Sequence, residues 1–427
     1  MSWKRKLGIT VIVLVPLLLA LGIFGAVLFA RQGGFAPYRV PRGGRHDVPH
    51  DAATLEKGAY LAHLGNCAAC HTVRGGTPYA GGRAIVTDYG RIYSTNITPN
   101  AAHGIGDWSL EEFAHTMRHG VSRRGVLYPA FPYAHFALLT DADIAALYAY
   151  LQTLAPSNAQ APDNELDFPA SWRPSLIGWR MLFYRPPQGD ASADRGRYLT
   201  DGLGHCAMCH SRRGEFGSLP PQGYLAGGII PSVRWYAPPL DSARLQRYTP
   251  DELAQFLRSG KTDAGDAYGP MAEAIYDGLH ALSADDAGAI ARYLQSLPPH
   301  AVVRDTPVPA PQPVRTQAVD GSAVYRRVCS DCHGVDGEGT PGKYPALRDA
   351  VAVSVPEPVN AVRMVLYGGL PPTTPLNPQP YSMPPFVYQL KREEIAAVVN
   401  YVRQQFGHRA STLSGADIEP LEGIVLE

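Results

Sequence analysis

The sequence has no formal net charge and no cysteine outside three short motifs. Lys and Arg total 38 and Asp and Glu total 38, so the chain lacks the basic surface that binding to nucleic acid requires, and no nucleic-acid partner is expected. All six cysteines fall in three Cys-x-x-Cys-His motifs, which leaves none for a structural disulfide. No alternating run is long enough to predict a sheet, so the chain is expected to be mainly α.

Charge is absent from one long stretch near the N-terminus, Leu7–Ala30. At about 1.5 Å per residue, a helix of this length would span a hydrocarbon core of roughly 30 Å, whereas a cleaved signal peptide usually has only about 7–15 apolar residues. We therefore predict a retained N-terminal transmembrane helix within residues 1–31. Lys4, Arg5 and Lys6 precede the run, so the positive-inside rule predicts a cytoplasmic N-terminus and places the rest of the chain in the periplasm or an equivalent compartment.

The three cysteine motifs have the spacing of covalent haem attachment sites. Two thiols separated by two residues can each form a thioether to one haem vinyl group, and the histidine that follows lies under the iron as its proximal ligand. A zinc site or a redox-active cysteine pair is the alternative for a single motif, but three copies without any further cysteine favour haem. We predict three covalently bound c-type haems, attached at Cys67, Cys70 and His71, at Cys206, Cys209 and His210, and at Cys329, Cys332 and His333.

Similar residues surround each motif, which indicates three copies of one module. A glycine and a tyrosine precede each motif, and a helix with a further tyrosine ends each module. This pattern suits two helices that cross closely beside a haem. The residues concerned are Gly58, Tyr60 and Tyr150 in the first copy, Gly196, Tyr198 and Tyr293 in the second, and Gly321, Tyr325 and Tyr401 in the third.

The repeats define the expected domain organisation. The first linker is rich in aromatic residues and is expected to pack across modules, against a partner or against the membrane surface. The second linker is Pro-rich and is expected to be semi-extended, and the C-terminal tail has no strong pattern. We predict three tandem class I cytochrome c domains at 51–155, 191–298 and 318–408, linkers at 156–190 and 299–317, and a tail at 409–427.

Capping patterns mark the helices inside the first two modules. Ser109 with Glu112, and Thr249 with Glu252, match the capping box that satisfies free backbone N–H groups at a helix start. Thr140 and Ser283 are expected to cap the terminal helices of the same modules.

Each module also needs a second axial ligand, normally a methionine in the loop before the last helix, because Met is a common partner to His in cytochromes c. Met271 and Met383 both lie in proline-containing loops at this place, and we predict that they bind the second and third irons. The alternative is that these side chains pack against the porphyrin edge. Met117 and Met364 lie on predicted helices, where core packing is the expected role.

The first module lacks this methionine. Aligned without gaps from Trp108 on Tyr248, the first module has Phe131 where the second has Met271, and phenylalanine has no lone pair to give. We favour His135, four residues further along the same loop, as the sixth ligand, because imidazole binds iron well. Another histidine, such as His119, and an open or water-bound site are the alternatives. Two histidine ligands would give this haem a lower potential than the other two.

Several segments resemble one known family, the membrane-bound tri-haem cytochrome c subunits of bacterial periplasmic dehydrogenases. The resemblance covers nearly all of the part predicted to lie outside the membrane. It rests on "GNCAACHT" at 65–72, "GIGDWSLEEF" at 104–113, "LYPAFPY" at 127–133, "GHCAMCHS" at 204–211, "WYAPPL" at 235–240, "YGPMAE" at 268–273, "CSDCHGVDGEG" at 329–339 and "PQPYSMPPF" at 378–386.

The resemblance implies a subunit that transfers electrons and performs no substrate chemistry itself. Its expected partners are a catalytic dehydrogenase subunit, a small iron–sulfur or accessory subunit, and ubiquinone or a terminal oxidase at the bacterial inner membrane. Family members serve PQQ-dependent alcohol dehydrogenases, flavin-dependent sugar dehydrogenases, or molybdenum hydroxylases that act on aldehydes or N-heterocycles. The form "YPAFPY", with Phe131, is more similar to the molybdenum-linked group. A haem enzyme or sensor with an open first haem, and a free-standing shuttle, are the alternative functions.

Overall fold

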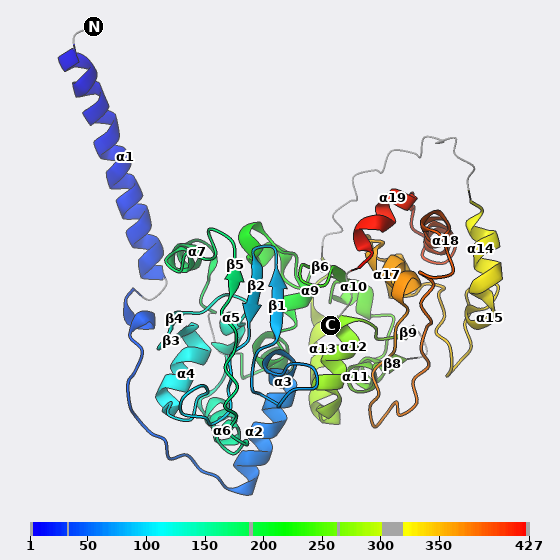
Figure 1. Cartoon of the computed structure of the whole chain (residues 1–427), viewed down its shortest axis with the longest axis horizontal. Helices are drawn as coiled ribbons and strands as arrows, with labels where there is room; N and C mark the ends of the chain where they lie inside the picture. The colour runs from blue at the N-terminus through cyan, green and yellow to red at the C-terminus, as the bar shows by residue number, and fades with distance from the viewer. Residues whose placement is uncertain (1–2, 32–33, 188–190, 263–264, 301–318, 424–427) are drawn as a thin grey trace.

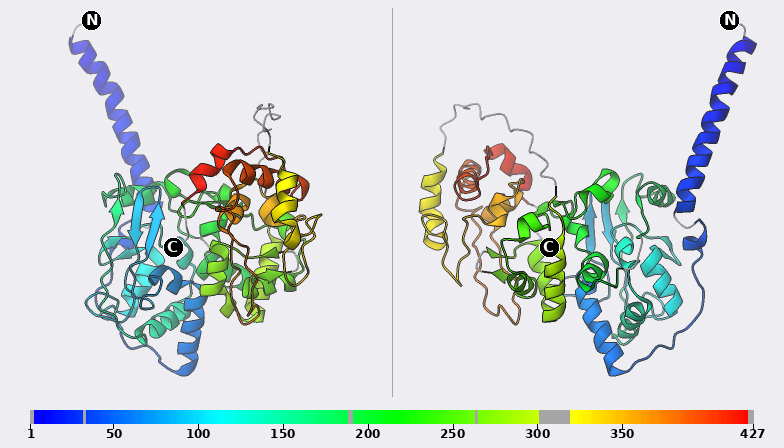
Figure 2. Two further views of the ribbon diagram at one scale, coloured as in Figure 1. Left: turned by 45° about the vertical axis from the view of Figure 1, so that its right-hand side comes forward. Right: turned by 180° about the vertical axis from the view of Figure 1, so that it is seen from behind.

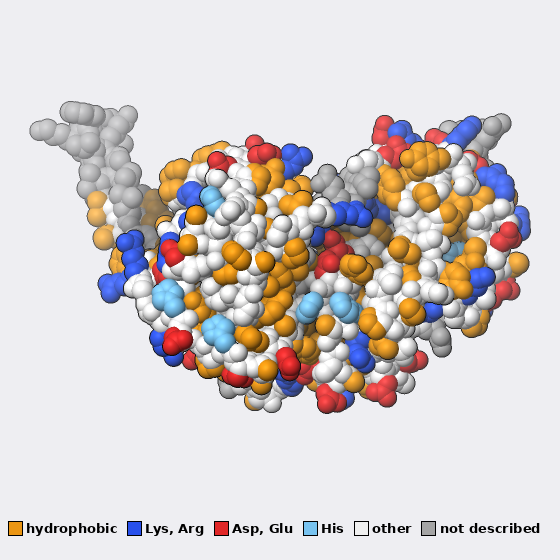
Figure 3. Space-filling view, turned by 60° about the horizontal axis from the view of Figure 1, so that its bottom comes forward, with side chains coloured by type: hydrophobic (Ala, Val, Ile, Leu, Met, Phe, Trp, Pro, Cys, Tyr) orange, Lys and Arg blue, Asp and Glu red, His pale blue; other side chains and the backbone are white. Residues whose placement is uncertain are grey.

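The computed structural model describes residues 3–31, 34–187, 191–262, 265–300 and 319–423, without the side chains of 3–14, 18 and 31. The described chain is mostly helical. Three units follow one another, which we call the first unit (51–155), the second unit (191–298) and the third unit (319–423) (Figure 1). On the face shown in Figure 3, acidic and basic side chains are interspersed, which agrees with the balanced composition.

Helix α1 (Trp3–Arg31) projects away from the three units in every view (Figures 1 and 2). Among the described residues, no helix combines the length and the apolarity that crossing a bilayer requires. The N-terminal transmembrane helix of the expected fold class was therefore wrong. The sequence argument weighed an uncharged run by its length, and length alone does not make a span.

The first unit places its attachment motif between a long helix and two short strands. Helices α2 and α6 pack against each other, and the loop before α6 carries the expected distal residues. Its elements are α2 (Ala52–Leu64), α3 (Cys67–His71), β1 (Ala84–Thr87), β2 (Gly90–Tyr93), α4 (Leu110–His119), β3 (Val121–Ser122), β4 (Gly125–Val126), α5 (Tyr133–Phe136) and α6 (Asp141–Gln152).

The second unit repeats this order, with a π-helical stretch before its motif. Its elements are α8 (Arg195–Arg197), η2 (Tyr198–Leu203), α9 (Ala207–His210), η3 (Glu215–Gly217), η4 (Pro221–Gly223), β6 (Gly228–Ile230), β7 (Trp235–Ala237), α10 (Ser242–Leu245), α11 (Pro250–Ser259), β8 (Lys261–Thr262), β9 (Gly265–Asp266), α12 (Pro270–Asp277), η5 (Leu279–Ala281) and α13 (Ala284–Ser296).

The third unit has fewer elements and no named strand among its described residues. Its elements are α14 (Gly321–Val328), α15 (Ser330–His333), α16 (Val351–Ser354), α17 (Val359–Tyr367), α18 (Arg392–Gln405), α19 (Gly415–Ile418) and η6 (Glu419–Leu421). The last two form part of the tail that had no strong pattern. Ile418 of α19 is fully buried against the third unit, so the tail completes this core.

Helix caps form where the sequence predicted them. Ser109 and Thr249 each take part in a reciprocal capping box with the glutamate three residues on, and Thr140 and Ser283 each accept a backbone N–H at the start of α6 and α13. These bonds satisfy N–H groups that have no partner within a helix, which fixes where each helix begins.

The glycine before each motif allows the first helix of a unit to cross a later helix closely, namely α6, α13 or α18. A Cβ atom at this glycine would overlap a backbone carbonyl oxygen of the crossing helix and would approach the Cβ of its tyrosine. The sequence-based expectation of a close crossing is confirmed in all three units. The glycines and the carbonyls they face are Gly58 and Ala146, Gly196 and Ala289, and Gly321 and Ala397.

Short antiparallel strands are present although no sheet was expected. Strands β1 and β2 pair from Ala84 with Tyr93 to Thr87 with Gly90, and β5 (Glu165–Leu166) adds to β2 as a third strand. The other three sheets contain two strands each. Strands of two to four residues are too short to show an alternation of apolar and polar residues in the sequence, and this is why no sheet was expected.

The first linker packs on the first unit. Helix α7 (Ser175–Phe183) contributes Leu176 to a small core with Val121 and Val126, and Arg173 donates to the carbonyl of Val126 over 2.8 Å. The expectation that this aromatic stretch is more than a free tether is thus confirmed. The Pro-rich linker 299–317 lies, from residue 301 on, outside the described residues.

The first and second units share one hydrophobic core, whereas the third unit has its own. Two reciprocal contacts join the first two units at the ends of α6 and α13. The Tyr60 hydroxyl donates to Asp286 over 2.6 Å, and the Tyr198 hydroxyl donates to Asp143 over 2.5 Å. The second and third units meet through polar contacts, among them two hydrogen bonds of 2.8 and 2.7 Å between Asn360 and the backbone of Tyr236.

Candidate haem sites

The three motif histidines are held in the same way. Each Nδ1 lies against a backbone carbonyl oxygen, at 2.6 Å for His71 and Thr95, 2.7 Å for His210 and Pro238, and 3.0 Å for His333 and Pro345. A carbonyl can only accept, so each Nδ1 carries the proton and each Nε2 keeps a lone pair. Burial lowers the pKa of all three imidazoles, which favours the neutral form that binds a metal.

Each motif forms one helical turn, which brings its cysteines and its histidine to one side. Residues three and four apart face the same way on a helix, so Cys67 lies on the same face as Cys70 and His71. In each motif the first cysteine packs against a hydrophobic core, namely Cys67 and Cys206 on the shared core and Cys329 on the core of the third unit. The first thiol of each motif thus borders an apolar region, as a covalent haem requires.

One buried polar atom in the second unit also fits a haem. The indole Nε1 of Trp235 is buried and has no hydrogen-bond partner within the described chain. This ring lies against Gly269, two residues before Met271, and the guanidinium of Arg363 is 5.4 Å from its centre. A buried donor that no protein group satisfies is costly, and a haem carboxylate is a suitable acceptor. The residues present therefore fit a c-type haem.

Met271 precedes α13, the last helix of the second unit, and Met383 precedes α18, the longest helix of the third unit. Met271 is the second residue of α12, so it lies at the start of a helix and not in the expected loop, because Pro270 begins that helix. It packs partly buried beside the shared core. Met383 is paired with Gly369 through two backbone hydrogen bonds of 2.8 and 3.0 Å, which fixes the position of its loop. Their role as iron ligands stays a prediction.

His135 reaches from the first unit to the second. It lies on α5, is 8% exposed, and its Nδ1 donates to the carbonyl oxygen of Asp201 over 2.6 Å. Its Nε2 thus keeps the lone pair, as in the motif histidines. Phe131 packs against Phe136, with ring centres 5.2 Å apart, and fills apolar space. His135 as the sixth ligand stays a prediction.

Two features of the structure were missed in the sequence. The reciprocal Tyr–Asp contacts had a signal, since Tyr60 and Tyr198, and the capping aspartates after Thr140 and Ser283, recur at matching places in the first two modules. The burial of Arg180 had no signal in the sequence. Arg180 lies on the linker helix α7 and is fully buried against the first unit, and nothing in the composition of the linker indicated this.

These sites and this repeated helical unit define the chain as a c-type cytochrome. The family model described as "Cytochrome c" matches residues 55–155 and 318–406. The gluconate 2-dehydrogenase cytochrome c subunit of Pantoea cypripedii is 38% identical over 86% of this chain and 89% of its own length. The alcohol dehydrogenase (quinone) cytochrome c subunit of Gluconobacter oxydans is 36% identical, over 89% and 84%. A nicotinate dehydrogenase subunit of Pseudomonas putida is 39% identical, over 90% of this chain but 33% of its own length.

The chain belongs to the family of cytochrome c subunits of dehydrogenase complexes, and the resemblance noted in its sequence is confirmed. It is an electron-transfer subunit rather than a catalytic one, and it carries covalently bound c-type haem.

Proposed function

We propose that the chain carries three covalent haems and passes electrons from a catalytic dehydrogenase subunit to ubiquinone or a terminal oxidase. The observation that carries the proposal is that all three motif histidines are held through Nδ1 by a carbonyl, which leaves three Nε2 atoms for three irons. A bound haem supplies one-electron chemistry. The chain's own residues attach it, orient its ligands and exclude water.

We further propose that the catalytic partner is a molybdenum hydroxylase that acts on aldehydes or N-heterocycles, with a small iron–sulfur subunit. Phe131, where the Met-bearing relatives have a ligand, supports this choice. The compared relatives are 36–39% identical and do not separate the classes. A flavin- or PQQ-dependent alcohol or sugar dehydrogenase is the alternative partner. The haem units would work in the periplasm.

Purification of the complex tests the partner. The full chain with a C-terminal tag is extracted in mild detergent, and the proteins and metals that come with it are identified. Molybdenum together with iron–sulfur subunits is the expected result. A flavoprotein or a PQQ-containing enzyme would keep the electron-transfer role and overturn the molybdenum partner, whereas the absence of any dehydrogenase would overturn the role itself.

Haem content tests the number of cofactors separately. The mass of the purified chain and its haemochrome absorbance should both give three haems. Replacing both cysteines of one motif with alanine should remove one haem and leave two. A wild-type chain with two haems would contradict the proposal.

One observation favours a second candidate function, a haem enzyme or sensor. Phe131 cannot bind iron and packs against Phe136 instead, so the first iron lacks the usual methionine, and without His135 or another histidine its sixth position would be open. Carbon monoxide discriminates between the two functions. Binding of one equivalent to the reduced protein would favour the enzyme or sensor, and no binding would favour electron transfer alone.

A further inference from the structure

Arg180 is a buried cation without a carboxylate. It lies on α7 and is 1% exposed. Its Nη1 donates to the carbonyl oxygen of His119 over 2.6 Å, and among the described residues its Nε and Nη2 have no partner, acidic or otherwise. Burying a charge is costly unless an opposite charge or a full set of hydrogen bonds compensates it. We therefore expect an anion to bind beside the Arg180 guanidinium.

The free atoms of this arginine have the geometry of a carboxylate receptor. Nε and Nη2 have no hydrogen-bond partner in the described chain, and these two N–H groups share the edge of the guanidinium that binds both oxygens of one carboxylate. The hydroxyls of Tyr38 and Tyr133 are also buried and without a partner, and their ring centres lie 5.9 and 4.9 Å from the guanidinium. A tyrosine hydroxyl carries one proton and can donate it to a carboxylate oxygen.

The groups around the site leave one positive charge to be neutralised. Burial, with the nearby charges of His115, Arg180 and Arg118, lowers the pKa of His119 to about 4, so this ring is neutral near pH 7. Burial also lowers the pKa of His115. Arg118 pairs with Asp141 over 2.6 Å. The surplus charge is that of Arg180.

The position of the site points to the source of the carboxylate. Tyr133 follows Phe131 by two residues, in the loop that contains the expected distal residues of the first unit. A group that reaches a side chain with 1% exposure must already be inside the protein, and a haem brings two carboxylates with it. Other half-buried arginines of this unit have carboxylates of their own: Arg83 with Glu273, Arg118 with Asp141, and Arg123 with Glu112.

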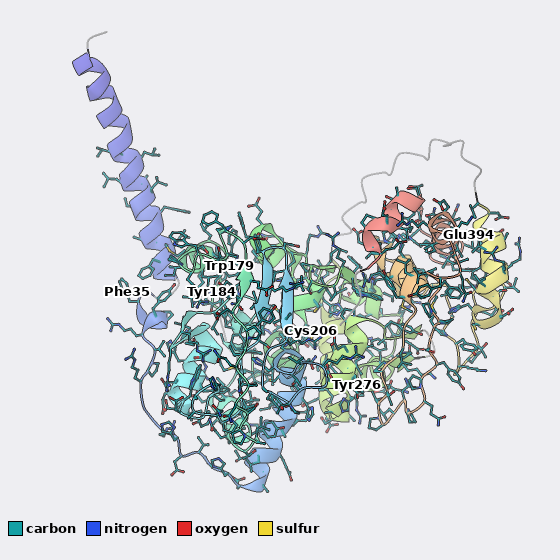
Figure 4. All side chains as sticks on the ribbon, viewed as in Figure 1. Phe35, Trp179, Tyr184, Cys206, Tyr276 and Glu394 are labelled. Carbon is teal, nitrogen blue, oxygen red and sulfur yellow. The ribbon has the colours of Figure 1, made fainter. Side chains whose placement is uncertain are left out.

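We propose that Arg180, assisted by the Tyr133 hydroxyl, binds a propionate of the haem attached to Cys67 and Cys70. The linker helix α7 would thereby set the potential of this haem, although α7 belongs to no cytochrome unit. Tyr184, which stacks on the same guanidinium at 4.6 Å, lies with Trp179 near Phe35 and the lower end of α1 (Figure 4). The proposal rests on the proposed haem of the first unit.

The electrostatics predict the effect of removing the charge. A cation beside a haem stabilises the reduced form, which carries one positive charge less than the oxidised form. Loss of Arg180 should therefore lower the potential of the first haem. An unpaired buried carboxylate also has a raised pKa, so the potential should become dependent on pH near neutrality.

The test uses the full chain and begins with the haem content. If the wild-type chain has no haem at Cys67 and Cys70, the proposed function fails and the Arg180 proposal fails with it. With that haem present, potentials are measured by redox titration from pH 5.5 to 8.5. The step of the first haem is assigned by elimination, because Met271→His and Met383→His each move one of the others.

Three variants and one control are compared. Arg180→Gln should lower the first potential and make it pH-dependent, Arg180→Lys should restore most of the potential because it keeps the charge, and Tyr133→Phe should act in the direction of Arg180→Gln but less strongly. The matched control is Arg173→Gln. Arg173 also lies in the linker, stacks at 5.2 Å on Tyr128 of the same loop and binds two carbonyl oxygens, but it is exposed.

Three outcomes would overturn the proposal. The first is an Arg180→Gln chain with all its haems and an unchanged first potential and pH dependence. If that variant does not fold, unchanged potentials in both Arg180→Lys and Tyr133→Phe overturn it equally. The second is a shift in Arg173→Gln as large as that in Arg180→Gln. The third is a shift of the wild-type potential on exchange of chloride for acetate at equal ionic strength, which would show that a free carboxylate, not the propionate, occupies the site.

Discussion

At the scale of single residues, the distal methionines set two of the potentials. Replacing Met271 or Met383 with His should lower the potential of one haem in each variant, because thioether ligation raises the potential relative to imidazole. Met117→Leu is the control, since Met117 is buried in the helix α4 and is assigned to core packing. Redox titration measures all three. A Met271→His chain with unchanged potentials and spectrum would show that Met271 only packs against the haem.

His135 has two roles that substitutions can separate. In His135→Leu the imidazole and the hydrogen bond to the Asp201 carbonyl are both lost, and the unsatisfied carbonyl should cost about 1–3 kcal/mol of stability. In His135→Asn a side-chain N–H can still donate to that carbonyl, so most of this stability should remain. Both variants should change the ferric spectrum of the first haem. An unchanged spectrum in both would remove His135 as the ligand.

At the scale of elements, the crossing of α2 and α6 depends on Gly58. In Gly58→Ala the new Cβ would collide with the Ala146 carbonyl, so the helices must separate, and the free energy of unfolding should fall by about 1–3 kcal/mol or more. Gly178→Ala on α7 is the control, because nothing lies within 4 Å of its added Cβ. Removing a helical glycine there should be neutral or stabilise by about 0.4–1 kcal/mol. Denaturant unfolding measures both, and equal effects would contradict the close crossing.

The same elements show what a sequence can predict. Capping residues and the repeated glycines act within one or two turns, so Ser109, Thr249 and Gly58 predicted local structure correctly. Contacts between distant segments leave no such local trace. The burial of Arg180 against the first unit depends on how the linker folds back. Strands β1 and β2 are only four residues long, so their sequences do not show the alternation of apolar and polar residues that predicts a strand. Helix α19 was within reach, because Ser414 and Asp417 form a capping box that the sequence contains.

Among the expected distal ligands, too, local features were predictable from the sequence and contacts with distant segments were not. Met271 and Met383 stand out because few other methionines exist, and their place before the last helix follows from the repeat. The partner of His135 lies in the second unit, on η2, and no pattern in the first module could indicate it. Whether Met271, Met383 and His135 bind iron is decided by the redox titrations and ferric spectra of their variants.

At the scale of the whole molecule, the contact between the first two units depends on charge. Burial raises the pKa of Asp286, but hydrogen bonds from Arg195 and Tyr60 outweigh burial, so the pKa is lowered overall. A carboxylate with a lowered folded-state pKa stabilises the protein above its unfolded pKa of about 4, and this stability is lost as the pH falls through the folded value. Asp286→Asn should thus lose about 1–2 kcal/mol at pH 7 and much less near pH 3. Equal losses at both pH values would contradict the assignment.

The shared core makes the first two units one cooperative body. Leu61 and Leu147 of the first unit and Leu199, Leu203 and Ala291 of the second belong to one cluster, whereas the third unit closes its own core around Tyr325 and Val362. A fragment of residues 34–300 should therefore fold with a stability close to that of the same part of the full chain, and a fragment of 319–423 should also fold alone. A fragment of 34–155 should not, because it would expose half of the shared core to water.

Denaturant unfolding and limited proteolysis of the three fragments, all made in the same compartment so that their haems can attach, measure this difference. The fragment 319–423 is the internal control, since it keeps its own hydrophobic core on separation and loses surface contacts such as those of Asn360 with Tyr236 and of Lys261 with Gly342. A 34–155 fragment as resistant and as stable as 34–300 would mean that the shared core contributes little and that the two units are independent. Loss of the first haem from 34–155 but not from 34–300 would tie haem retention in the first unit to its neighbour, as the hydrogen bond from His135 to the second unit predicts.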